Sequence, residues 1–168
     1  MAVVGVAVAF GFWTASAHAT PAAQSDQQPS LVEDFTYPGA KAIAAQYGVT
    51  LISGDGHIVF ADCTTPVENN IGVLQVRTTD TIGSNGTGLL CFKVLGVPGH
   101  LDLMVPAVFE IRGDGRAAGA GHKVTAELTT DSGEHTTVAV NPSGSTAVGV
   151  GAGPDNKPTT LLTLDATP

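Results

Sequence analysis

The stretch GDGHIVFADC, from Gly54 to Cys63, crowds two aspartates, a histidine and a cysteine together behind two glycines. Asp55, His57 and Asp62 are residue types that bind divalent metals or transfer protons. A metal site needs all three side chains to converge, and Asp55 and His57 can do so only if both leave the turn on one side. Asp-Gly before an alternating run is also among the strongest hairpin-turn signals. We interpret the stretch as a hairpin turn and keep Asp55, His57 and Asp62 as candidate metal or catalytic residues.

Signals for other catalytic chemistry are weak. No Gly-x-Ser-x-Gly motif occurs, and the serine at 131–133 (Asp-Ser-Gly) lies in an expected hairpin turn. Acidic residues are numerous enough for a glycosidase pair, but aromatic residues make up only 5% of the chain. The tripeptide at 112–114 (Arg-Gly-Asp) lies on an expected turn, where its glycine serves the loop. The sequence therefore predicts no catalytic residue, no cofactor and no bound metal, and it favours a protein that is not an enzyme.

Cys63 and Cys91 are the two cysteines of the chain, and both lie in or beside expected strands. A metal site built on them would need histidine or further cysteine at ligand spacing, which the sequence does not offer. In an oxidising compartment such a pair is expected to form a disulfide. We predict a Cys63–Cys91 disulfide, and a loop of this length corresponds to about 3–4 kcal/mol of stabilisation.

A short helix and a series of strands are expected to position these residues. The run AKAIAAQY contains strong helix formers, so a helix is predicted from about Pro38 to Tyr47, with Ala40, Ile43, Ala44 and Tyr47 on one face. From residue 49 onward, short stretches with period two are bounded by Gly, Pro, Asn, Asp or Ser. They cover residues 49–52, 57–63, 73–79, 89–96, 100–106, 108–113, 123–130, 134–140 and 159–166, and 143–157 is glycine-rich with room for a short edge strand.

The alternation within these stretches predicts which side chains form the core. In two of them the residues expected to face inward are Leu101, Leu103, Val105, Val124, Ala126 and Leu128. About nine short strands at this spacing indicate an all-β fold. We predict an antiparallel β-sandwich or partly closed barrel with one short N-terminal helix.

The N-terminal residues have the pattern of an export signal. The apolar run 2–13 is too short to span a bilayer as a helix, and Ala17-His18-Ala19 places small residues at the two positions that a signal peptidase reads. No Lys or Arg precedes the run. We expect a secreted, extracellular protein that consists of a signal peptide (1–19), a flexible leader (20–30) and a single β-domain (31–168).

The charge of the chain limits its partners. Fifteen acidic and seven basic residues give a net charge of −8. Such an acidic protein repels nucleic acid and anionic membranes. We therefore predict no nucleic-acid partner, and no membrane association after signal cleavage.

Four segments in order, VEDFTYPGA, GDGHIVFADC, CFKVLGVPGHLDLMVPAVFEIRG and TTLLTLDA, carry a family resemblance over residues 32–166. The chain resembles small secreted proteins of actinobacterial type (high-GC Gram-positive bacteria). These share a signal peptide, a Gly-Asp-Gly-His turn, one cysteine pair and a Pro-x-Val-(Phe/Tyr) strand start. The resemblance implies that the protein is extracellular, and it does not imply any particular biochemical activity.

These observations together favour a secreted, non-enzymatic β-domain that binds a protein or a cell-envelope component through its loops or a sheet edge. One alternative is a small secreted hydrolase or metal-dependent enzyme around Asp55, His57 and Asp62. Another is a secreted protease inhibitor that presents the loop at 97–100 (Val-Pro-Gly-His) to its target.

Overall fold

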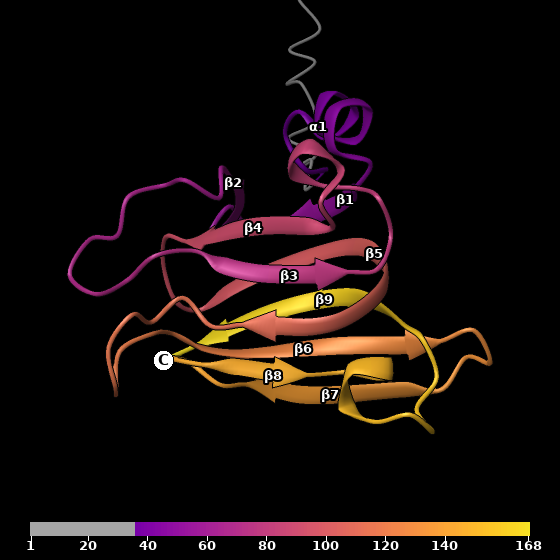
Figure 1. The fold of residues 1–168 in the computed structure, drawn as a ribbon. Helices are drawn as coiled ribbons and strands as arrows, with labels where there is room; N and C mark the ends of the chain where they lie inside the picture. The colour runs from indigo at the N-terminus through magenta and orange to yellow at the C-terminus, as the bar shows by residue number, and fades with distance from the viewer. Residues whose placement is uncertain (1–35) are drawn as a thin grey trace, which may run out of the picture. The chain divides into compact units, whose positions relative to one another are not determined.

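The computed structural model describes residues 36–168, and strands make up much of this part of the chain (Figure 1). The predicted signal peptide (1–19) and leader (20–30) lie outside the described residues. Residues 36–168 fall within one compact unit. No helix in this part of the chain has the length and apolar character needed to cross a membrane.

The described residues form one α-helix, two short 3-10 helices and nine strands. The helices are α1 (Ala40–Tyr47), η1 (Ser84–Gly86) and η2 (Gly149–Ala152). The strands are β1 (Thr50–Gly54), β2 (Ile58–Ala61), β3 (Leu74–Thr78), β4 (Leu89–Val94), β5 (Gly99–Arg112), β6 (Lys123–Thr130), β7 (His135–Val140), β8 (Ser145–Ala147) and β9 (Thr159–Thr167).

The long strand β5 is shared by two layers of antiparallel strands. Its first half lies between β1 and β9, and its second half lies between β3 and β8. The layer that we call the β3 layer contains β2, β4, β3, the second half of β5 and β8. The β6 layer contains β1, the first half of β5, β9, β6 and β7 (Figure 1). The strand order runs from β2 to β7 without closing, so the predicted all-β fold is confirmed and is an open sandwich.

β5 changes layer near Pro106 and Ala107. Ala107 has a φ of 52°, and the register of β5 against β9 shifts between Val105 and Val108. The sequence predicted two strands here, 100–106 and 108–113, because proline usually ends a strand. That prediction is wrong, since a bulge does not require an N–H from the proline. The ninth strand is β8, within the glycine-rich segment.

The apolar core lies between the two layers. All six residues predicted to face inward are buried: Leu101, Leu103, Val105, Val124, Ala126 and Leu128. Helix α1 packs Ala40, Ile43 and Tyr47 against the margin of this core, which confirms most of the predicted helix face, but Ala44 is exposed. The Tyr47 ring lies 4.7 Å from that of Phe60 on β2.

The Asp-Gly stretch is a tight turn, but it is not a hairpin turn. Gly56 has a φ of 82°, a backbone conformation that favours glycine. However, β1 pairs with β5 and β2 pairs with β4, so the chain crosses from the β6 layer to the β3 layer at this turn. The hairpin prediction is therefore wrong. The local signal identifies a reversal of the chain, whereas strand pairing is decided by how the layers pack.

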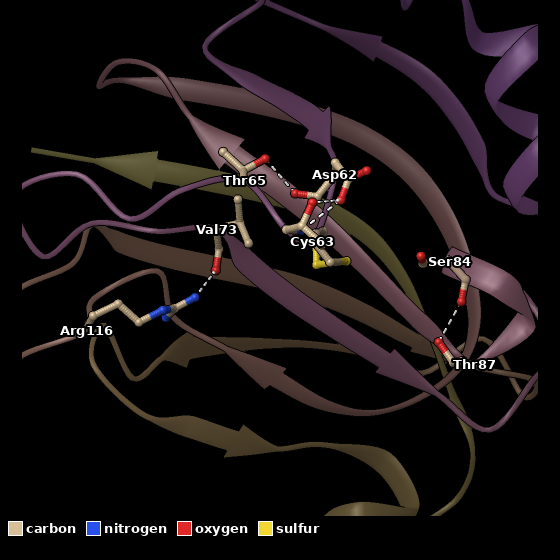
Figure 2. The surroundings of a disulfide bond; sticks show 9 residues. Asp62, Cys63, Thr65, Val73, Ser84, Thr87 and Arg116 are labelled. Atoms are coloured by element: carbon tan, nitrogen blue, oxygen red, sulfur yellow. Dashed lines mark hydrogen bonds between the residues drawn. A yellow bond between two sulfur atoms is a disulfide. The ribbon is translucent and has the colours of Figure 1, made fainter.

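Cys63 and Cys91 form the predicted disulfide (Figure 2), with their Cα atoms 5.2 Å apart and a sequence separation of 28. Ala61 at the end of β2 lies opposite Cys91 on β4, so the bond joins two neighbouring strands of the β3 layer. Cys91 is fully buried. The bond thus anchors the start of the long loop between β2 and β3.

Candidate functional site

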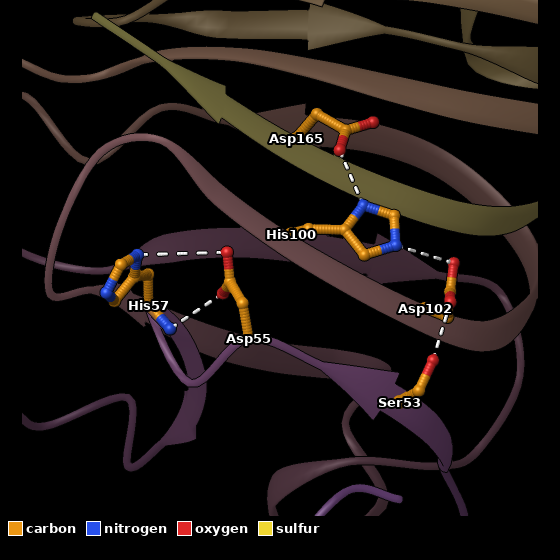
Figure 3. Close-up of polar contacts among 6 residues, drawn as sticks. All are labelled: Ser53, Asp55, His57, His100, Asp102 and Asp165. Atoms are coloured by element: carbon orange, nitrogen blue, oxygen red, sulfur yellow. Dashed lines mark hydrogen bonds and ion pairs between the residues drawn. The ribbon is translucent and has the colours of Figure 1, made fainter. Parts of the chain in front are cut away.

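Asp55 and His57 brace the turn between β1 and β2 (Figure 3). The backbone N–H of His57 donates to Oδ1 of Asp55 at 2.9 Å, and Nδ1 of His57 lies 3.7 Å from Oδ2 of the same carboxylate. Nδ1 also donates to the Pro98 carbonyl at 2.5 Å, which ties the turn to the loop between β4 and β5. The contacts of His57 are therefore those of a residue that fixes two adjacent loops.

Asp62 lies at the other end of β2. At about 3.3 Å per residue, the five positions from His57 to Asp62 span roughly 16 Å. Oδ1 of Asp62 accepts the N–H and the hydroxyl of Thr64, each at 2.7 Å, and these two hydrogen bonds lower the pKa of Asp62. The structure therefore does not bring Asp55, His57 and Asp62 together. Among residues 36–168, no three His, Cys, Asp or Glu side chains are placed to hold a metal ion.

A second polar cluster lies where β1, β5 and β9 run side by side (Figure 3). His100 on β5 places Nδ1 2.6 Å from Oδ1 of Asp165 on β9, and Nε2 3.2 Å from Oδ1 of Asp102. Ser53 on β1 donates its hydroxyl to Oδ2 of Asp102 at 2.6 Å. Cross-strand pairing assembles this cluster, because His100 lies opposite Asp165 and Ser53 lies opposite Asp102.

The electrostatics of this cluster favour a positively charged His100. The hydrogen bond to Asp165 raises the pKa of His100 above its ordinary value of 6.5; burial opposes the rise, and Asp102 adds to it. Both ring nitrogens of His100 face carboxylates, so neither is directed at a hydroxyl from which it could take a proton. The Ser53 hydroxyl, moreover, is bonded to Asp102 rather than to the imidazole. The cluster contains the residue types of a hydrolytic triad in an order that does not activate the serine.

Sequence reasoning missed this cluster. The alternation in 100–106 places His100 and Asp102 together on the outer face, which was the available signal. Asp165 lies 65 residues after His100 in the sequence. A carboxylate on the outer face of a strand is common, so nothing in the sequence connects the two residues. Only the β5–β9 register reveals that His100 and Asp165 are neighbours.

The Arg-Gly-Asp tripeptide is not displayed to a partner. Asp114 is fully buried. Its Oδ1 accepts the backbone N–H of His122 at 2.9 Å, and its Oδ2 lies 2.6 Å from Nδ1 of the same histidine. Asp114 therefore holds together the two ends of the β5–β6 loop, which agrees with the interpretation that the tripeptide serves that loop.

The free edge of the β6 layer is the third candidate. β7 pairs with β6 along one side, and no other strand among the described residues pairs with it. At the β6–β7 turn the Thr130 N–H donates to the Glu134 carbonyl. Because hydrogen-bonded pairs alternate along an antiparallel ladder, the backbone groups of His135, Thr137 and Ala139 point away from β6. Among residues 36–168, nothing pairs with these donors and acceptors, which lie at the free edge of the β6 layer.

This edge lacks the features that usually protect an edge strand. The β7 sequence HTTVAV contains no lysine, acidic residue or proline. All but Val138 and Val140 are exposed. Edge strands in soluble proteins are usually short, charged, bulged or covered, because an open ladder attracts another strand. β7 is thus suited to pair with an incoming polypeptide.

A hollow of about 340 Å³ adjoins this edge, between β7 on one layer and β8 with η2 on the other. Its apolar lining includes Leu128, Val138 and Val148, and Glu134 and Lys157 are among its charged lining residues. Val138 is half-buried at the margin of the core, and Val148 is buried within it. The hollow is therefore the point at which the space between the two layers opens to solvent.

Comparison of the chain with known protein families finds no match, and comparison with curated protein sequences finds none either. The interpretation of these candidate sites therefore depends on their geometry. The actinobacterial resemblance remains a prediction.

Proposed function

We propose that this chain is a secreted, non-enzymatic β-domain that binds an extended segment of a partner polypeptide, itself a secreted or cell-envelope protein, along the free edge of β7. The single observation that carries the proposal is the unpaired backbone of His135, Thr137 and Ala139 at that edge. Added strands gain affinity from backbone hydrogen bonds and specificity from pockets that receive alternate side chains.

The hollow beside β7 supplies such a pocket. In a strand added to β7, every second side chain faces the same way as Thr136 and Val138, which line the hollow. Those side chains would close the open side of the sandwich and contact buried Val148. An inward-facing aliphatic residue suits this lining, and it would bury apolar surface that the free chain leaves in water.

Charge indicates the character of the segment. The chain as a whole has a net charge of −8, and Asp155 and Glu134 lie at the hollow beside the single cation Lys157 among its lining residues. An acidic segment would be repelled. We therefore expect the bound segment to alternate aliphatic residues with neutral or basic ones.

The secreted setting is supported by two observations of different kinds. The N-terminal apolar run followed by Ala17-His18-Ala19 is typical of a signal peptide. The Cys63–Cys91 disulfide is of the sort that persists outside the reducing cytosol.

A library of random decapeptides displayed on phage and selected against the immobilised full chain tests the proposal. We expect the selected peptides to show aliphatic residues at alternate positions. Thr137→Pro removes an outward N–H and adds a bulky ring at the edge, so it should weaken binding about tenfold or more. Thr137→Val changes the side chain and keeps the N–H, and it should bind as the wild type does.

The pair of variants separates backbone pairing from other modes of binding. Equal binding of the selected peptides to Thr137→Pro and the wild type would overturn the proposal. So would a selection that yields only peptides without extended alternation. The melting temperatures of both variants show whether the fold is intact, since proline is tolerated where an edge N–H faces solvent.

The presentation of a rigid loop to a protease is a second candidate function. Of the loop predicted at 97–100, only Val97 and Pro98 lie between β4 and β5, because Gly99 and His100 begin β5. Leu95 and Val97 are 60% and 40% exposed, and the loop is held by the Leu95 N–H bond to the His57 carbonyl and by the His57 bond to Pro98. Inhibition assays against a panel of secreted proteases test this function. Loss of any inhibition in Leu95→Asp would place it in the loop.

The third possibility, a metal-dependent enzyme around Asp55, His57 and Asp62, gains no support from the geometry, because Asp62 lies at the far end of β2. Metal analysis of the purified protein tests it directly. A stoichiometric metal lost on His57→Gln would favour it over the binding function.

A further inference from the structure

Arg112 stands apart from the other two arginines of the chain. Arg77 pairs with Glu110 at 3.5 Å, and the Arg116 guanidinium donates to carbonyl groups, one of them that of Val73 at 2.9 Å (Figure 2). The Arg112 side chain makes no hydrogen bond or ion pair with the residues that the structure describes, and its Nε is buried without a partner. Leaving this buried Nε without an acceptor costs stability, and the terminal nitrogens of the same guanidinium also make no hydrogen bond within residues 36–168.

A second unpartnered polar side chain lies directly beside Arg112. Gln75 on β3 is its cross-strand partner, so both side chains stand on the outer face of the β3 layer. Gln75 is half-buried, and its amide makes no side-chain hydrogen bond within residues 36–168. Two neighbouring strands thus hold polar side chains side by side, and neither the Arg112 guanidinium nor the donor and acceptor of the Gln75 amide has a hydrogen-bond partner among residues 36–168.

The carboxylates near Arg112 already bond to other groups. Glu110 on the same face contacts Arg77 and also accepts the Ser145 hydroxyl at 3.0 Å. Asp114 is buried and bonded to His122. No acidic side chain among residues 36–168 therefore makes an ion pair with Arg112.

A second guanidinium, that of Arg116, lies near Arg112. Burial lowers the pKa of Arg116, and the charge of Arg112 lowers it further, while Asp114 acts in the opposite direction. The two guanidiniums are thus close enough to repel each other. Lys93, on the outer face of β4, pairs with Glu68 at 3.7 Å. An anion placed at Arg112 would relieve the repulsion between the arginines.

We propose that Arg112 and Gln75 form a binding site for a tetrahedral oxyanion, a phosphate or phosphate ester group, with Arg116 contributing its charge from beside the site. The two terminal nitrogens of the Arg112 guanidinium would donate to two oxygens of such a group, and the Gln75 amide would donate to a third from the neighbouring strand. A tetrahedral group fits donors that come from two strands better than a planar carboxylate does. This site lies on the β3 layer, so it does not depend on the proposed binding edge at β7.

The test is an NMR titration of the full chain with inorganic phosphate, with sodium chloride at matched ionic strength as the reference. We expect the Arg112 Nε–Hε and Gln75 side-chain amide signals to shift with phosphate and not with chloride. Arg112→Gln should weaken phosphate binding about tenfold, as expected for loss of a charge-assisted bidentate contact. The matched control Arg77→Gln, which removes an arginine already paired with Glu110, should bind as the wild type does.

A second arm, with a glycerol phosphodiester polymer in place of phosphate, distinguishes the source of the group. Shifts with the polymer alone assign the site to an envelope phosphodiester, and shifts with phosphate alone assign it to a free phosphate. The proposal is overturned if neither probe moves the Arg112 signal beyond the chloride reference. It is also overturned if Arg77→Gln weakens binding as much as Arg112→Gln. The test for a shift of the Arg112 signal uses the wild-type protein alone, so it remains valid even if a variant fails to fold.

Discussion

His100 shows how single residues set the pH response of this protein. Its pKa is raised in the folded state, chiefly by Asp165 and also by Asp102, so the folded chain holds its proton more tightly than the unfolded chain does. The resulting stabilisation is fully present below pH 6.5, the ordinary value for histidine. It is lost as the pH rises through the raised pKa of the folded state.

We therefore predict that the free energy of unfolding falls as the pH rises from about 6.5, and that His100→Gln removes this part of the dependence. Because the imidazole is partly exposed, the loss should amount to only about 0.5–1 kcal/mol. Urea denaturation of both proteins between acidic and alkaline pH measures it. Parallel curves for the variant and the wild type would show that the His100 cluster does not hold the strands together.

Gly56 carries the second prediction at this scale. Its φ of 82° is unfavourable for a β-branched residue, although a Cβ there meets no atom within 4 Å. Gly56→Val should therefore destabilise the fold by about 1 kcal/mol or more through backbone conformation alone. Gly56→Asn is the matched control, since asparagine tolerates this conformation, and it should cost clearly less. Equal melting temperatures for the two variants would contradict this account of the turn.

At the scale of elements, the disulfide is the feature that the sequence predicts most directly. Cys63→Ala and Cys91→Ala should each lower the free energy of unfolding by about 3–4 kcal/mol, and the double variant should lose little more, because either change breaks the same bond. Denaturant unfolding of the three variants measures this. Two additive losses would mean that the bond is not the shared cause.

The strands themselves could be located from their alternation, but their pairing could not. Period two identifies the inward face of 100–106 and 123–130, because one side of each strand must be buried. The Asp-Gly signal correctly predicts that the chain reverses at Gly56. It wrongly predicts a hairpin, because the local sequence does not determine which layer the next strand joins. The sequence also did not predict that β5 continues past Pro106, because a proline in the sequence marks a strand break and a bulge equally well.

The candidate sites depend on this unpredicted pairing. The His100–Asp165 contact and the Gln75–Arg112 neighbourhood each need a cross-strand register between distant segments. The free edge at β7 follows from being last in the strand order. Sequence analysis could therefore suggest a sheet edge as a binding surface without identifying the strand.

At the scale of the whole molecule, export is the first prediction. The protein recovered from culture medium should begin at Thr20, within a residue or two, because Ala17-His18-Ala19 follows the apolar run. N-terminal sequencing checks this. An intact Met1 on protein recovered from the cytoplasm would contradict the proposed location and remove the reason to expect a stable disulfide.

The central claim is that β7 is an open edge that receives another strand, and amide hydrogen exchange in β7 tests it most directly. In the free protein the amides of Thr136 and Val138, which pair with β6, should exchange slowly, while those of Thr137 and Ala139 should exchange fast. With a selected decapeptide bound at saturation, the fast pair should become protected. The account would be contradicted if Thr137 and Ala139 were already protected in the free protein, or if they stayed unprotected in the complex.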